Sequence, residues 1–137
     1  MDYMSQVFQF NFEKTYKEVD VAGKVYQVEF NDDAINKYQK SLKSFGKKTK
    51  EVQGLIPDYE KATDEEIDNL MNKQKELVKH VVETFLGEGT FEDLYEKAGK
   101  SVGNLMTLVD YLNNLYLEEA KEKAEKVQAK YLANVKK

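Results

Sequence analysis

Hydrophobic and polar residues alternate along the first 30 residues, which is the pattern of half-buried β-strands. The segment "VFQFNF" places Phe8, Phe10 and Phe12 on one face, and "YKEVDVAGKVYQVEF" adds two runs around Ala22 and Gly23. Glycine supplies the positive φ that a two-residue hairpin turn requires. We therefore expect a three-stranded antiparallel β-meander over 1–30, packed on another element because so small a sheet is unstable alone.

After Asn31 the spacing of apolar residues changes to that of helices. Asn31 is suited to cap a first helix, and Thr63 with Glu66 forms a capping box before a second one. A loop containing Pro57, the single proline, separates the two helices. The faces predicted to be buried are Ile35, Tyr38, Leu42 and Phe45 in the first helix, and Ile67, Leu70, Leu77, Val78, Val81 and Phe85 in the second.

The stretch "EKAGKS" resembles the end of a phosphate-binding loop, but its surroundings favour a corner between two helices. Thr90 with Asp93 predicts a short helix that Gly99 ends, and Ser101 is suited to cap the next helix. A P-loop needs glycine where Leu94 stands and follows a buried strand. Nucleotide binding is therefore not expected here.

The last helix is predicted to run from Val102 almost to Lys137, about 54 Å, which exceeds the width of a domain of this size. Its first half is rich in apolar residues, whereas its second half is mostly charged with a thin apolar stripe. We expect one α+β domain with a β-meander (1–30), a helical core of a bundle of about four helices (31–117) and a projecting C-terminal helix (118–137). The residues predicted to contact a partner are Val127, Tyr131, Leu132 and Val135.

The amino-acid composition of the chain argues against several classes of function. The chain has 137 residues, no cysteine, and 21 basic residues that are all lysine, with a net charge of −4. Without arginine there is no planar fork for bidentate contacts to phosphate or guanine, so specific nucleic-acid binding is not expected. No apolar run is long enough to span a membrane, and the start lacks the pattern of a signal peptide. These features predict a cytoplasmic protein.

No group of residues predicts catalysis or a cofactor. His80 is the one histidine, and Glu76 and Glu83 lie at helical spacing from it on a face predicted to meet water. A salt-bridged surface histidine is favoured there over a metal site, which needs further ligands and a dry surrounding shell. The acidic residues at 64–66 open a helix, where they complement its dipole. We expect no enzyme activity, no metal and no cofactor.

Lysines crowd the first helix, and an acidic run follows at 58–68. Solvated faces are the favoured interpretation. The alternative is an electrostatic surface for another subunit or a partner, formed by Lys40, Lys43, Lys47 and Lys48.

The hairpin "VDVAGKVYQVEF", with Gly23, Lys24, Tyr26, Val28 and Phe30, leads into the acidic helix start "NDDAINKY". In this motif and in its order of elements the chain resembles the tail assembly chaperones of long-tailed, siphovirus-type phages and prophages of Gram-positive bacteria. The resemblance implies a non-enzymatic protein of the bacterial host cytoplasm that binds the tape measure protein and keeps it soluble during tail assembly. It also implies oligomers, and a longer frameshifted form whose extension recruits the tail tube protein.

Two alternatives remain from other classes. One is a small structural virion protein, such as a tail or head-completion subunit, which would stay in the particle. The other is a nucleic-acid-binding regulator that uses the lysines between 37 and 50.

Overall fold

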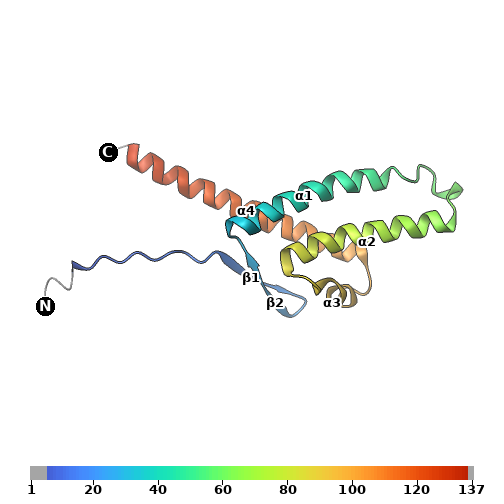
Figure 1. The fold of residues 1–137 in the computed structure, drawn as a ribbon, viewed down its shortest axis with the longest axis horizontal. Helices are drawn as coiled ribbons and strands as arrows, with labels where there is room; N and C mark the ends of the chain where they lie inside the picture. The colour runs from blue at the N-terminus through green and yellow to red at the C-terminus, as the bar shows by residue number, and fades with distance from the viewer. Residues whose placement is uncertain (1–5, 136–137) are drawn as a thin grey trace.

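The fold is α+β: a two-stranded antiparallel hairpin is followed by four α-helices within residues 6–135, the part of the chain that the computed structural model describes. Side chains are described as far as Leu132. Figure 1 shows the hairpin lying against the helices, with residues 7–14 and the second half of the last helix extending from one end of the molecule.

Strands β1 (Tyr16–Val21) and β2 (Lys24–Glu29) form the hairpin that the sequence predicts. Ala22 and Gly23 form its two-residue turn, with φ of 53° and 87°. The Gly23 N–H donates to Asp20 Oδ1 at 2.9 Å, which stabilises the turn. Alternation then places Val19, Tyr26 and Val28 in the core.

The prediction of a third strand over "VFQFNF" is wrong. Residues 7–14 are extended but pair with no other described strand, and Phe8, Phe10 and Phe12 are 97%, 78% and 89% exposed. A meander needs a turn between neighbouring strands, but Glu13, Lys14 and Thr15 include neither glycine nor proline. The segment therefore continues β1 beyond the end of β2 instead of folding back on it. We call residues 7–14 the arm.

Helices α1 (Asp32–Gln53) and α2 (Asp64–Leu86) form an antiparallel pair, joined by a loop with the short 3₁₀ helix η2 (Tyr59–Lys61). Both predicted caps are confirmed. Asn31 Oδ1 accepts from the Ala34 N–H at 2.8 Å, and Thr63 Oγ1 accepts from the Glu66 N–H at 3.1 Å. Each cap satisfies a backbone donor that the first helical turn leaves free.

Helix α3 (Thr90–Lys97) begins differently from the prediction, because Gly89 and not Thr90 occupies its N-cap. The Thr90 hydroxyl instead donates to the carbonyl of Gly87. The predicted corner after α3 is confirmed. Gly99 has φ of 72°, and the Lys100 N–H donates to the Tyr95 carbonyl at 2.8 Å in a Schellman arrangement.

Helix α4 (Val102–Val135) has 34 residues, about 51 Å at 1.5 Å per residue. Ser101 Oγ accepts from the Asn104 N–H at 3.1 Å at its start, as predicted. Leu105, Val109 and Leu112 are buried, whereas every residue from 120 to 132 is exposed.

The main core joins the hairpin to α1, α2, α3 and α4. At its centre the ring of Tyr38 stacks on Phe85 with centroids 4.0 Å apart, and Phe30 meets Tyr38 edge to face at 6.0 Å. The packing of these rings fixes the position of the connection between β2 and α1. It therefore also fixes the point at which the arm leaves the rest of the structure.

Candidate functional site

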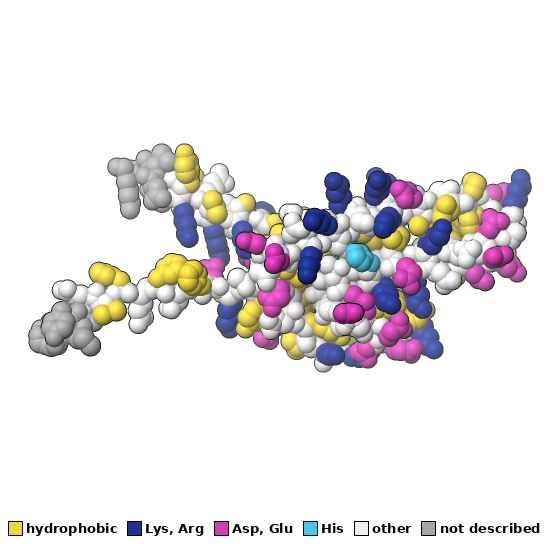
Figure 2. Space-filling view, viewed as in Figure 1, with side chains coloured by type: hydrophobic (Ala, Val, Ile, Leu, Met, Phe, Trp, Pro, Cys, Tyr) yellow, Lys and Arg dark blue, Asp and Glu magenta, His cyan; other side chains and the backbone are white. Residues whose placement is uncertain are grey.

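The exposed half of α4 carries the apolar residues that the sequence analysis assigns to partner binding. Val127, Tyr131 and Leu132 are 68%, 67% and 49% exposed, and the side chain of Val135 lies outside the described residues. We call Val127, Tyr131 and Leu132 the tail stripe. Figure 2 shows apolar side chains along one side of this part of α4 and lysines along the other, beyond the body of the molecule.

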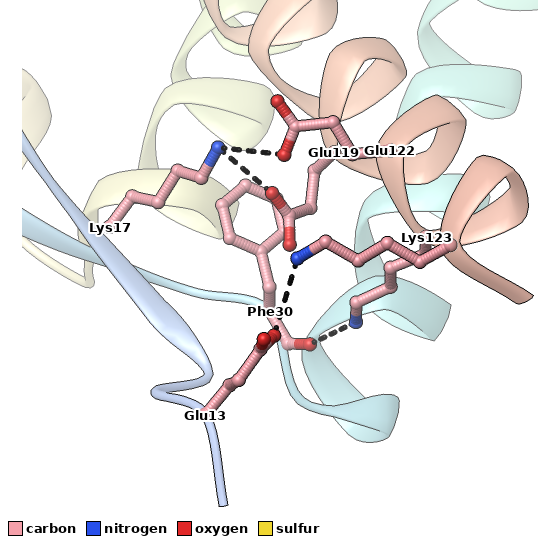
Figure 3. Close-up of polar contacts among 7 residues, drawn as sticks. Glu13, Lys17, Phe30, Glu119, Glu122 and Lys123 are labelled. Atoms are coloured by element: carbon pink, nitrogen blue, oxygen red, sulfur yellow. Dashed lines mark hydrogen bonds and ion pairs between the residues drawn. The ribbon is translucent and has the colours of Figure 1, made fainter. Parts of the chain in front are cut away.

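Polar contacts tie the opposite side of this helix to the hairpin and the arm (Figure 3). Lys17 Nζ lies 2.9 Å from Glu119 Oε2 and 3.7 Å from Glu122 Oε2. The hydrogen bond with Glu119 raises the pKa of Lys17 above its ordinary value, because it favours the charged amine.

Two further lysines of α4 reach back to the N-terminal part of the chain. Lys123 Nζ donates to the Phe30 carbonyl at 3.1 Å, and Lys126 Nζ lies 3.3 Å from Glu13 Oε2. Although they are exposed, these contacts fix the rotation of α4 about its axis. The sequence analysis missed them, and the only signal was the recurrence of glutamate and lysine at helical spacing.

Tyr131 and Leu132 consequently face away from the hairpin, whereas Val127 borders the contact side. An α-helix turns about 100° per residue, so Tyr131 and Leu132 lie about 80° and 180° around the helix from Lys123, and Val127 lies about 40° from it. Lys130 lies beside Val127, and Glu125, which pairs with Lys121, lies beside Leu132; all three charged residues are exposed. The surface is therefore an apolar strip bordered by charges of both signs and open to solvent.

The four lysines assigned to an electrostatic surface come together on α1. Lys40, Lys43, Lys47 and Lys48 are exposed, line one shallow hollow with Ser44 and Glu51, and form no ion pair with a carboxylate of the described residues. The acidic run at 58–68 lies beyond the end of α1, at the far end of the molecule from the tail stripe.

His80 is exposed, as predicted, but the predicted salt bridge is wrong, since no ion pair involving it occurs among residues 6–132. Glu83 instead accepts from the backbone N–H groups of Gly89 and Phe91 at 3.0 and 3.2 Å. Its carboxylate caps α3, a role that the sequence analysis missed. Within the described residues, no three His, Cys, Asp or Glu side chains lie close enough to hold a metal ion.

Comparisons with known proteins give no family: no protein-family model matches the chain, and neither the curated proteins nor the solved structures include a match. None of the described helices combines the length and apolar character that crossing a membrane requires.

Proposed function

We propose that this protein is a non-enzymatic tail assembly chaperone of a phage or prophage, which binds the tape measure protein and keeps it soluble in the bacterial cytoplasm until the tail is assembled. The observation that carries the proposal is the tail stripe, an apolar strip on a helix that no other described part of the chain covers. The hairpin motif, by which the chain resembles these chaperones, supplies the identity of the partner.

The surface suits a long helical partner for a physical reason. Apolar residues at helical spacing bind the apolar face of another helix, and the buried side chains supply most of the affinity. The charged residues beside the stripe, Lys130 and Glu125 among them, would meet opposite charges at the edge of such an interface, which favours the rate and specificity of association. We propose the tail tube protein and further copies of this chain as the other partners.

Coexpression with the tape measure protein tests the proposal. The measured quantity is the soluble fraction of the tape measure protein, with and without this chain. We expect wild type to raise that fraction and Tyr131→Glu to raise it much less, because the substitution places a charge in the contact.

Ala129→Glu is the matched control. Ala129 is exposed on the same helical turns. It lies about 160° around the helix from both Val127 and Tyr131 and about 60° from Leu132, so it is a control for contact on the Val127 and Tyr131 side of the stripe. It should behave as wild type. Equal activity of wild type and Tyr131→Glu would refute the role of the tail stripe, and no effect of wild type would refute the proposed function.

A further inference from the structure

The arm has the pattern of a β-strand but no strand partner in the described chain. It carries three exposed phenylalanines at alternating positions and follows the direction of β1 past the end of β2. Eight extended residues span about 26 Å. Figure 1 shows the arm running clear of the body, from the same end of the molecule as the end of α4.

Contacts on both sides of Thr15 fix which face of the arm looks outward. In β1, Lys17 and Val19 face the helices, since Val19 is buried and Lys17 contacts Glu119. The same alternation places Glu13 on that face, in agreement with its contact to Lys126. Phe8, Phe10 and Phe12 therefore lie on the opposite face.

The aromatic contacts agree with this assignment. The rings of Phe10 and Phe12 meet edge to face with centroids 4.9 Å apart, so they share one side of the strand. For α4 to cover these rings, the alternation of side chains along the strand would have to shift by one residue. Such a shift would turn Glu13 and Lys17 away from their partners on α4. The chain's own helices thus cannot bury the phenylalanine face.

The backbone of the arm has no described strand partner on either edge, since β2 ends before it reaches residues 7–14. Phe30 donates to the Thr15 carbonyl, so the odd-numbered residues direct their backbone groups toward β2. The even-numbered residues, Phe8, Phe10 and Phe12 among them, direct theirs to the free edge. An edge of this kind is a template for another strand.

We propose that the arms of two copies of this chain pair as antiparallel strands centred on Phe10. Phe10 then faces Phe10 of the second copy, and Phe8 faces its Phe12, so all six rings lie on one face of the paired arms. Each Glu13 lies opposite Val7 of the other copy. A parallel pairing would instead place the two Glu13 carboxylates side by side and the two Lys14 amines side by side.

This pairing has two-fold symmetry, so both copies use the same surface and the assembly closes as a dimer. It joins the two hairpins into one continuous β-structure. The contact between Glu13 and Lys126 joins the base of each arm to its own α4 on the face opposite the phenylalanines and leaves the phenylalanine face open to the partner strand. The proposal builds on the self-association named in the proposed function and assigns it to a surface. It uses the arm alone, so it can fail without the tail stripe failing.

Disulfide cross-linking tests the register, because the chain has no cysteine of its own. Facing residues in this pairing have Cα atoms about 5.5 Å apart, within the range that a disulfide bridges. We expect the Phe10→Cys variant to cross-link with itself under mild oxidation. Phe8→Cys and Phe12→Cys should cross-link when mixed but not separately, since like positions are about 13 Å apart along the strands.

Sedimentation over a concentration series tests the dimer without a cross-link. Phe10→Asp places two carboxylates opposite each other and should shift the midpoint for dimer formation at least tenfold higher in concentration. Asn11→Asp adds the same charge on the opposite face of the arm and should leave it within about twofold of wild type. Since these positions are exposed, the circular dichroism of each variant should match wild type.

Three results would overturn the proposal: wild type that stays monomeric at every concentration, Phe10→Asp that dimerises like wild type, or cross-linking that is as strong for Phe8→Cys alone as for the mixture. A monomer whose arm is protected only by an added second protein would assign the arm to that protein, which also overturns it.

Discussion

Removing residues 120–137 should leave a folded protein, because no described side chain of this segment is buried. Between this segment and the rest of the protein, the truncation removes two exposed ion pairs, from Lys126 to Glu13 and from Glu122 to Lys17, and one hydrogen bond from Lys123 to the Phe30 carbonyl. Exposed ion pairs contribute about 0.2–1 kcal/mol each, and a hydrogen bond of this kind about 1 kcal/mol. We expect the free energy of unfolding to fall by about 1–3 kcal/mol.

Urea unfolding followed by circular dichroism measures this change. Leu112→Ala is the reference variant for the loss of a core contact. Leu112 is fully buried, and truncating such a leucine lowers the free energy of unfolding by about 2–5 kcal/mol. The truncated protein should unfold cooperatively and be more stable than Leu112→Ala. Loss of the cooperative transition, or a larger destabilisation than Leu112→Ala, would refute the reasoning and make the end of α4 part of the core.

Three further predictions concern the body of the protein. Gly99→Ala should lower the free energy of unfolding by about 1–2 kcal/mol, because φ is 72° there. Gly46→Ala within α1 should instead raise it by about 0.5–1 kcal/mol. Urea midpoints of the two variants that move in the same direction would contradict this. Burial, with a smaller effect from the nearby Glu29, raises the pKa of Tyr38 to about 12. An unfolded tyrosine ionises near pH 10, so stability should fall as pH rises from about 10 to 12, and Tyr38→Phe should remove that part of the pH dependence of the urea midpoint. Glu83→Ala should cost about 1 kcal/mol in thermal unfolding through loss of the α3 cap, and a variant as stable as wild type would show the cap to be dispensable.

The features that the sequence predicted best depend on residues close together in the chain. The hairpin turn at Gly23, the caps at Asn31 and Thr63 and the corner at Gly99 each require a particular conformation or hydrogen bond within a few positions. Helical spacing likewise located Tyr38 and Phe85 in the core. Local geometry decides these features, so a single sequence carries the information.

The third strand was predicted wrongly because alternation is the same for a paired strand and an unpaired one. What distinguishes them is the missing turn signal between Phe12 and Tyr16, together with the end of β2 where α1 begins. Nothing else in the sequence indicated that the three phenylalanines would form an exposed surface.

The contacts that orient α4 could not be predicted because their partners are distant in sequence. Lys123 and Phe30 are 93 positions apart, and Lys126 and Glu13 are 113 apart. Many glutamates and lysines have suitable spacing, and only the folded chain selects among them. The thin stripe at Val127 and Tyr131 could be identified from the sequence, but its occupant depends on a second chain.

Photo-cross-linking from position 131 during coexpression with the tape measure protein tests most directly whether the tail stripe binds it. A photoreactive amino acid in place of Tyr131 should give a cross-linked product containing tape measure peptides, and the same group in place of Ala129 should give little. Equal yields from the two positions, or no tape measure peptide at position 131, would contradict the account.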